Sequence, residues 1–310
     1  MNSLSGLFKL IGLFLGKGAS FKLLLGVFLL MKFVMTGHKG LIGSFLLKRL
    51  ISEGHKQVLL IDKREGKNIL DLNKVNLKEN AEVLIHLASF CKINQIIENP
   101  ALAFTNNSRG TEEVMEFCKR NQIKKIIFTS SSRILSKEKN PYTASKIYGE
   151  ELVKGYSQCY KMDYVIIRPS TVYGPFNDET KRLMDVFILN ALNGKELKIL
   201  GDENKTLDFT YIDDFIDGFI LAMNQKNKEF DLSGGKGVKV SFVADLIIKL
   251  NGGGKKGFYP SEIAQPQEVE LDISKIKKIG YNPKVSIEEG IKRTFDWYKA
   301  NLNEINSKRK

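Results

Sequence analysis

The chain has 310 residues, of which 43% are hydrophobic and 27% charged, a composition typical of a globular protein rather than a disordered one. Its cysteines (Cys91, Cys118 and Cys159) are odd in number and widely spaced, which argues against a disulfide framework or a zinc site and for a reducing compartment. The last of its three histidines is His86, which excludes a histidine-based metal site and a catalytic histidine late in the chain.

The net charge of +13 has two interpretations. It is either a lysine-rich solvated surface, which we favour, or an attraction to a polyanion such as a nucleotide substrate, a nucleic acid or an acidic membrane. Apart from the tail at 307–310, the positive charge is scattered along the chain. Scattered charge does not discriminate between these partners.

Residues 1–30 are apolar but interrupted by lysines. Their uncharged runs are shorter than the roughly 18–20 residues that span a bilayer, and Lys17 and Lys22 would each cost about 2.5–3.5 kcal/mol inside one. We favour an extension outside a fold that begins at Met31. The alternatives are a membrane-surface helix and an extra packed helix. A signal peptide is not expected, because no clean cleavage site follows this segment. The expected location is therefore the cytoplasm, and peripheral membrane contact through residues 1–30 is the alternative.

A glycine-rich turn follows the first strand pattern, residues 33–36. Gly37 would allow the sharp turn, Gly40 would let a pyrophosphate approach the backbone, and Gly43 would let the next helix pack on the strand. Residues 45–51 have the pattern of that helix, so the phosphates would lie at its positive end.

A second buried-strand pattern, residues 58–61, ends at Asp62. This position lies about twenty residues after the glycines, where a carboxylate would accept hydrogen bonds from an adenosine ribose. The sequence therefore predicts dinucleotide binding. The charge of Asp62 disfavours a 2′-phosphate and so favours NAD over NADP, while the neighbouring Lys63 and Arg64 keep NADP as the alternative.

Strand and helix patterns then alternate with little linker between them. Further strands are expected over 81–88, 124–130 and 164–168, and helices over 108–120 and 142–160. Such alternation predicts an α/β fold with a Rossmann-type, doubly wound parallel sheet. Because the chain contains no low-complexity linker, a second, smaller region must be built from late insertions.

Tyr142 and Lys146 are four residues apart and share one face of the expected helix. A tyrosine titrates near 10, so we expect the lysine, together with an oxidised nicotinamide, to lower the pKa of the phenol and make it a base. The serines of 130–132 end a strand at the carboxyl edge of the sheet, where ligands of such folds bind. A serine hydroxyl there would hold the substrate oxygen while Tyr142 removes its proton.

Several further motifs occur in a fixed order. They are Ile85-His-Leu-Ala-Ser89, Asn107-Ser-Arg-Gly-Thr111, Phe128-Thr-Ser-Ser-Ser132, Arg168-Pro-Ser-Thr-Val-Tyr-Gly-Pro175, Asp208-Phe-Thr-Tyr-Ile-Asp-Asp214 and, near the end, Asp272-Ile-Ser-Lys275 and 280–290. With the glycine turn and the Tyr-Lys pair, they resemble the extended short-chain dehydrogenase/reductase superfamily, specifically the NAD-dependent epimerase/dehydratase family that acts on nucleotide sugars. The resemblance runs from about residue 31 to 300.

The resemblance and the turn together assign the site residues. The catalytic residues would be Ser131, Tyr142 and Lys146. The cofactor, NAD, would contact Gly37, Lys39, Gly40, Leu41, Ile42, Gly43, Asp62, Asn68, Ile69, Leu87, Ala88, Ser89, Asn107, Tyr142, Lys146 and Pro169. The substrate would contact Ser131, Ser132, Thr171, Arg182 and Lys205. No metal is expected.

The resemblance also implies a division of the chain. Residues 31–174 would form the NAD-binding Rossmann domain, to which 203–223 would return. Residues 175–202 and 224–310 would form a smaller C-terminal substrate-binding subdomain. The expected partners are a nucleotide sugar and a second copy of the chain, since the family often dimerises through the helices that carry the Tyr-Lys pair.

Departures from the family pattern fall on the substrate side. Thr171 replaces the usual asparagine, and Leu207 replaces an arginine that commonly contacts the substrate pyrophosphate. The segment between Ser131 and Tyr142 has about half of the length expected, so either the pocket is more open or the substrate differs.

The same region bears on the reaction. The 4,6-dehydratases of the family carry an Asp-Glu pair after the hydroxyl residue, but Ser132 and Arg133 stand there. Members that use a Cys and a His beside the substrate are disfavoured because no histidine follows His86. We expect an epimerase, or a related oxidoreductase, that removes hydride from a sugar carbinol through a keto intermediate. The alternatives are an NAD(P)-dependent reductase or dehydrogenase of a non-nucleotide carbonyl compound and a non-catalytic, nucleic-acid-binding member of the fold.

Overall fold

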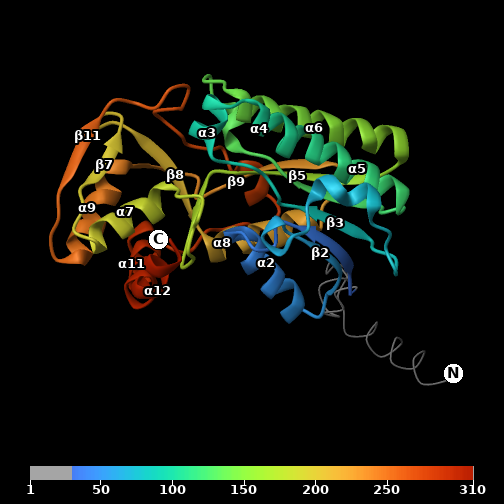
Figure 1. Cartoon of the computed structure of the whole chain (residues 1–310), viewed down its shortest axis with the longest axis horizontal. Helices are drawn as coiled ribbons and strands as arrows, with labels where there is room; N and C mark the ends of the chain where they lie inside the picture. Colours follow the sequence, from blue (N-terminus) through green and yellow to red (C-terminus); the bar gives the residue numbers. More distant parts are fainter. Residues whose placement is uncertain (1–29, 310) are drawn as a thin grey trace, which may run out of the picture. The chain divides into compact units, whose positions relative to one another are not determined.

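The apolar runs of the sequence form a six-stranded parallel sheet in the computed structural model, which describes residues 30–309 (Figure 1). The strands are β1 (Lys32–Thr36), β2 (Lys56–Ile61), β3 (Val83–His86), β4 (Lys125–Thr129), β5 (Asp163–Pro169) and β9 (Lys228–Leu232), in the spatial order β2-β1-β3-β4-β5-β9. The predicted doubly wound α/β fold is therefore confirmed.

The strand order places a ligand-binding edge. From β1 the chain crosses to β2 on one side and returns to β3 on the other, so the loops that leave β1 and β3 diverge at the carboxyl ends of neighbouring strands. Open α/β sheets bind ligands at such a switch point. The last paired residues of these two strands are Thr36 and His86.

Helices cover both faces of this sheet. Helices α2 (Leu41–Ser52) and α8 (Ile212–Met223) contact each other on one face, and α5 (Gly110–Arg120) and α6 (Pro141–Tyr160) cover the other (Figure 1). The shorter helices beside them are α3 (Ile93–Glu98), α4 (Ala101–Ala103), η1 (Lys63–Glu65), η2 (Ile69–Lys74), the π-helix η3 (Phe104–Arg109) and η4 (Ser132–Leu135). Strand residues such as Leu84, Ile126 and Ile166 have no exposed surface, because helices pack on both sides of them.

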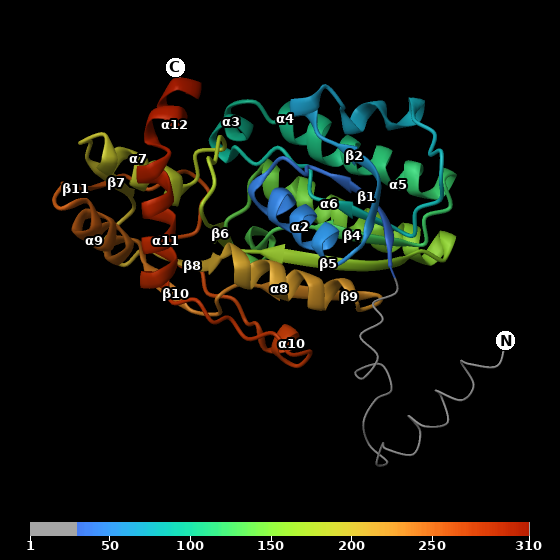
Figure 2. The ribbon, with the colours of Figure 1, turned by 90° about the horizontal axis from the view of Figure 1, so that it is seen from below.

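The later part of the chain builds two small sheets. These are β10-β8-β6, from β6 (Thr171–Tyr173), β8 (Thr206–Tyr211) and β10 (Gly237–Lys239), and β11-β7, from β7 (Leu197–Leu200) and β11 (Lys256–Tyr259). Helices α7 (Leu183–Leu192), α9 (Val240–Asn251) and α11 (Ile287–Ala300) pack together beside them (Figure 2). The remaining helices are α10 (Ser274–Lys277) and α12 (Leu302–Lys308).

Strand β9 joins the main sheet, so residues 228–232 lie in the same layer as the expected NAD-binding strands, and the division of the chain at 174 and 224 stays a prediction. Within residues 30–309, no helix is long and apolar enough to cross a bilayer. Residues 1–29 of the N-terminal extension, on which the membrane-contact prediction falls, lie outside the described residues.

Candidate active site

A cavity of about 780 Å³ runs along the carboxyl edge of the main sheet. Residues that follow four of its strands line the cavity, namely Gly37 after β1, Asp62 after β2, Leu87 after β3 and Ser131 after β4. Its far wall comes from later segments, including 178–183 and 262–271. One hollow thus joins the predicted dinucleotide turn to the predicted catalytic groups.

The three glycines of the turn meet different steric demands. Gly37 has a φ of +76°, and a Cβ there would lie 2.6 Å from the Ala88 nitrogen. A Cβ on Gly43 would lie 2.2 Å from the Gly37 carbonyl oxygen, so this glycine lets α2 pack on the turn. A Cβ on Gly40 would meet only that same oxygen, at 3.4 Å. Because the protein itself does not require a glycine at 40, the open space there fits the predicted approach of a pyrophosphate.

The start of α2 also suits an anion. Gly40 is the N-terminal capping residue, and no side chain caps the helix. Its first turn contains no acidic residue. The free N–H groups of Leu41 and Ile42, which line the cavity, are therefore directed at the ligand space by an uncapped helix end, an arrangement that binds phosphate.

Asp62 fastens the glycine turn to the end of β2. Its Oδ2 accepts a hydrogen bond from the Lys39 backbone N–H at 2.9 Å, and its Oδ1 accepts one from the Arg64 N–H at 3.0 Å. The Arg64 guanidinium donates to the Lys39 carbonyl at 2.6 Å and lies 3.4 Å from a carboxylate oxygen of Glu179. Because Arg64 already has these partners, it is poorly placed to serve a 2′-phosphate, which supports the choice of NAD.

The α6 helix delivers Tyr142 and Lys146 to the cavity. Asn140 caps the helix through the Thr143 N–H at 3.1 Å, and Pro141 occupies its first turn. Tyr142 and Lys146 are both buried and both line the cavity, with the Lys146 ammonium 6.0 Å from the centre of the Tyr142 ring. Lys146 Nζ donates to the Thr129 carbonyl at 3.0 Å, which fixes it at the end of β4.

Ser131 lies beside the phenol. It ends the β4 segment, and its Oγ accepts a hydrogen bond from the Arg133 N–H at 3.3 Å. The Ser131 side chain acts to lower the pKa of the Tyr142 phenol and so favours its ionised form. The structure thus brings the predicted Ser, Tyr and Lys together in one cavity.

Burial dominates the acidity of the Tyr142 phenol. Burial is the largest influence and raises the pKa of Tyr142 to about 12, while Ser131, Arg133 and Arg182 act to lower it. Burial thus outweighs these groups in the chain without NAD, and the expectation that Lys146 and an oxidised nicotinamide lower the pKa of Tyr142 stays a prediction. Burial also lowers the pKa of Lys146 itself to about 8, so its ammonium is costly in this position.

Asn107 lies behind the cavity and holds its wall in place. Asn107, on the π-helix η3, accepts hydrogen bonds from the Phe90 N–H at 2.8 Å and the Ser89 hydroxyl at 3.2 Å. Its amide donates to the Phe90 carbonyl and to Ser145 Oγ of α6. Asn107 therefore ties the loop after β3 to the catalytic helix, without lining the cavity itself.

His86 is a buried structural residue. One ring nitrogen lies 2.7 Å from Thr36 Oγ1, and the other lies 3.4 Å from Thr111 Oγ1. Burial lowers the pKa of His86 to about 3, so it is neutral at physiological pH. It joins strands β1 and β3 to helix α5.

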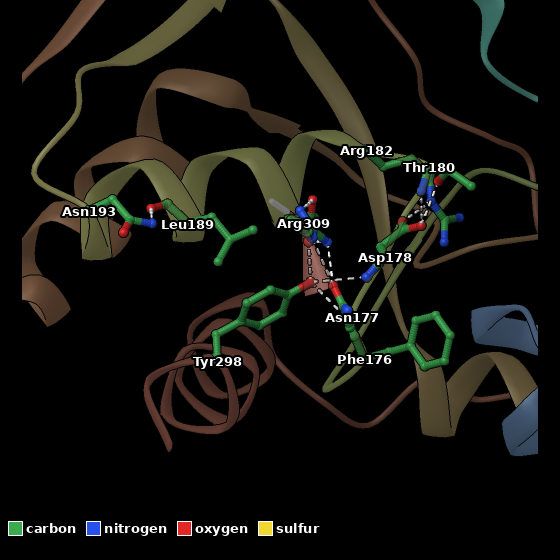
Figure 3. A network of polar contacts seen from close by, with 10 residues as sticks. Phe176, Asn177, Asp178, Thr180, Arg182, Leu189, Asn193, Tyr298 and Arg309 are labelled. Carbon is green, nitrogen blue, oxygen red and sulfur yellow. Dashed lines mark hydrogen bonds and ion pairs between the residues drawn. The ribbon is translucent and has the colours of Figure 1, made fainter. Parts of the chain in front are cut away.

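On the substrate side, Arg182 enters the cavity from the segment before α7. Its Nε donates to Asp178 Oδ2 at 2.5 Å, and Asp178 also accepts from Thr180 (Figure 3). The Tyr298 hydroxyl donates to the Phe176 carbonyl at 2.6 Å in the same network (Figure 3). Residues near the C-terminus thus set the position of this arginine.

Thr171, Lys205 and Leu207 line the same half of the cavity. Lys205 is buried and donates to the Leu200 carbonyl, and burial lowers its pKa. Leu207 presents an apolar surface where the resembling family commonly has an arginine.

The segment between Ser131 and α6 is short, but another segment closes this side of the cavity. Asn140 donates to the Ala264 carbonyl at 3.0 Å, and Asn94 donates to Glu262 Oε1 at 2.9 Å. Gln265 donates back to Asn94 at 3.1 Å. Residues 262–266, more than a hundred positions later in the chain, therefore take up space that a longer loop after Ser131 would fill.

Most of the predicted contact residues line the cavity, with two exceptions. Lys39 directs its ammonium to Glu65 at 2.7 Å, outside the cavity lining, and Asn107 lies behind the wall. Among the cavity-lining residues that the sequence did not single out as contacts are Arg133 and the 262–271 segment. A charged residue directly after a serine-ended strand could have indicated Arg133, whereas no pattern marked 262–271. Among residues 30–309, no acidic, histidine or cysteine cluster suited to a metal ion occurs.

Comparison with known proteins adds independent information. Residues 33–232 match the family model of the NAD dependent epimerase/dehydratase family. A putative UDP-glucose 4-epimerase of Methanocaldococcus jannaschii is 32% identical over 246 residues, covering 74% of this chain and 80% of the relative. A UDP-glucuronate 4-epimerase of Thermodesulfobacterium geofontis is 32% identical over 241 residues, which cover 72% of this chain and 74% of that relative.

A solved structure shares the fold along nearly the whole chain. The crystal structure of a UDP-glucose 4-epimerase from Thermotoga maritima with UDP-glucose is similar, with a TM-score of 0.78 and 25% sequence identity. The match covers 88% of this chain and 100% of that one.

Proposed function

Because the chain belongs to the NAD-dependent epimerase/dehydratase family, we propose that it epimerises a nucleotide sugar at a ring carbinol. The observation that carries this proposal is that Ser131, Tyr142 and Lys146 line the same cavity as the uncapped glycine turn. The relatives named as UDP-sugar 4-epimerases support a UDP sugar as substrate and C4 as the reacting carbon.

Each residue has a defined task in this proposal. The Ser131 hydroxyl holds the oxygen of the reacting carbinol, and Tyr142 takes the proton of that hydroxyl and later gives it back. The Lys146 ammonium, fixed by the Thr129 carbonyl, binds the nicotinamide ribose. The N-terminal end of α2 holds the phosphates, and Asp62 holds the adenosine ribose. When bound, oxidised NAD accepts the carbinol hydrogen as hydride and supplies positive charge that makes a nearby phenol more acidic.

Dehydration is disfavoured by the residues beside Ser131. Ser132 and Arg133 line the cavity there, so this stretch supplies no carboxylate for an elimination. In the proposed reaction, the ketone formed at the carbinol is reduced on its other face by the hydride that it gave up, and Tyr142 returns the proton to its oxygen.

The experiment has two stages. Mass spectrometry of the purified protein under native conditions should reveal carried-over NAD(H). Incubation with UDP-glucose, UDP-galactose, UDP-glucuronate and UDP-galacturonate should then interconvert at least one C4-epimeric pair. Bound NAD without any interconversion, and without stabilisation by any UDP, GDP or dTDP sugar, would favour the reductase alternative that Leu207 and Thr171 raised.

We also propose that the protein is a homodimer. Support comes from the outward face of the helices near the site, where Ile147 and Tyr148 of α6 are 39% and 42% exposed and Phe104 of η3 is 66% exposed. Burying such side chains is favourable by about 25 cal/mol per Å² of apolar surface. Sedimentation velocity should give a species of twice the chain mass that Tyr148→Glu converts to a monomer.

A further inference from the structure

Arg133 is a half-buried cation with one guanidinium nitrogen that is fully buried. It lies on η4 directly after the serines, and it lines the cavity. Its Nη1 is buried and has no hydrogen-bond partner within residues 30–309. Leaving a buried guanidinium nitrogen unpaired is costly, so such a group in a cavity wall indicates a missing ligand.

Nearby charges do not satisfy it. Glu262 acts on Arg133 electrostatically, but the two form no ion pair in the described part of the chain, and Glu262 accepts from Asn94 instead. Two other cations of this half have partners: Arg182 pairs with Asp178, and Lys205 donates to a backbone carbonyl. Arg133 is therefore the member of the three that awaits an anion.

The position of Arg133 restricts what that anion can be. Its charge acts on the Tyr142 phenol, and its backbone N–H donates to Ser131 Oγ. These two hydroxyl groups hold the reacting carbinol in the proposed function. An anion beside them belongs to the sugar ring itself, because the diphosphate lies beyond the anomeric carbon.

We propose that Arg133 forms a carboxylate subsite next to the reacting carbinol and that the substrate is a nucleotide-linked sugar acid. This inference rests on the proposed function and names its substrate class. A planar guanidinium binds a carboxylate through two parallel hydrogen bonds, which a ring hydroxymethyl group cannot form. A neutral sugar would leave the buried Nη1 of Arg133 without a charged partner, so the subsite selects against a neutral sugar.

The test compares an acidic with a neutral sugar on the same nucleotide. UDP-glucuronate and UDP-glucose are assayed for kcat/KM with the NAD-loaded protein, and for Kd by calorimetry with its Tyr142→Phe variant. We expect the protein to prefer UDP-glucuronate by about 30-fold, the effect of a charge-assisted hydrogen-bond pair. Arg133→Gln should remove most of this preference by lowering kcat/KM and weakening binding for UDP-glucuronate, with the values for UDP-glucose unchanged. Arg133→Lys should restore part of the preference.

The control is Arg293→Gln on α11, because Arg293 lies outside the cavity lining. This variant should leave kcat/KM and Kd unchanged for both sugars. Equal losses for both sugars in Arg133→Gln would overturn the proposal and assign Arg133 to the diphosphate that they share. A preference of the unaltered protein for UDP-glucose would also overturn it. If neither sugar is turned over, the proposed function fails, and the two Kd values still decide whether Arg133 binds the carboxylate.

Discussion

The two halves of the cavity are built in different ways. The cofactor half consists of short loops that directly follow β1, β2 and β3, and backbone geometry and one carboxylate hold them. The substrate half includes Arg133, 178–183 and 262–271, which are far apart in the sequence. Side-chain hydrogen bonds to Asn94 and Asn140 hold residues 262–266 in place. The first half is encoded locally, whereas the second depends on the packing of distant segments. Specificity can therefore vary without changing the dinucleotide cradle.

The sharpest test of this contrast removes the group at the boundary between the halves. Tyr142→Phe deletes only the phenol oxygen that takes and returns the proton, so kcat should fall about 10³-fold. Bound NAD, measured by native mass spectrometry, should be unchanged, since the cradle is untouched. Near-full activity in this variant would remove Tyr142 from the mechanism.

A smaller effect is expected when the cradle itself is overpacked. In Gly43→Ala the new methyl would approach the Gly37 carbonyl oxygen at 2.2 Å, which should cost about 1–3 kcal/mol of unfolding free energy and weaken NAD binding. The matched control is Gly155→Ala in α6, where a Cβ meets no atom within 4 Å. This control should gain about 0.5–1 kcal/mol in urea unfolding. Similar stabilities for the two variants would contradict the packing account.

The buried lysine predicts a pH dependence of stability. Because the pKa of Lys146 falls from 10.5 to about 8 on folding, the folded chain binds fewer protons than the unfolded one between these values. Stability should therefore rise with pH across this window, and the cost of the buried ammonium should be fully present below pH 8. Between pH 7.5 and 10, the unfolding free energy of the NAD-free protein should rise by about 2 kcal/mol relative to Lys146→Met. A constant difference between the two would show that Lys146 does not titrate in this range.

The smallest effect should come from the distant support of the substrate half. Tyr298→Phe removes the hydroxyl that donates to the Phe176 carbonyl and lies 2.6 Å from Asp185 Oδ1. Loosening this network frees the segment that carries Arg182, so KM should rise about 3- to 10-fold, equivalent to one hydrogen bond, with kcat unchanged. The measurement is steady-state kinetics, and the control is Tyr148→Phe, because the ring of Tyr148 is exposed on α6. A fall in kcat at constant KM would place the network in the chemical step.

This contrast also explains what the sequence could predict. The sequence places the glycines, Asp62, Tyr142 and Lys146 at the cavity because their positions depend on spacing within one strand, turn or helix, and the family resemblance adds Ser131. The raised pKa of Tyr142 was missed because helical spacing shows that two side chains are neighbours but not how deeply they are buried. Lys39 was assigned to the cofactor by its place in the turn, yet its ammonium is directed at Glu65.

The substrate half left weaker traces in the sequence. The contacts of 262–266 with Asn94 and Asn140 join residues more than a hundred positions apart, and polar loop residues carry no periodicity that would indicate such contacts. Arg133 was noticed only as a departure from the dehydratase pattern, because its burial and its unpaired nitrogen are properties of the folded cavity.

The central claim is that the reacting carbon loses its hydrogen as hydride and regains the same hydrogen on its other face while Tyr142 moves only the hydroxyl proton. A UDP sugar carrying deuterium at C4 tests this directly in ordinary water, with the product followed by mass spectrometry and NMR. The account predicts a C4-epimerised product that keeps the deuterium at C4. Loss of the deuterium to solvent would contradict the account, because it would mean that a base removes a proton from carbon.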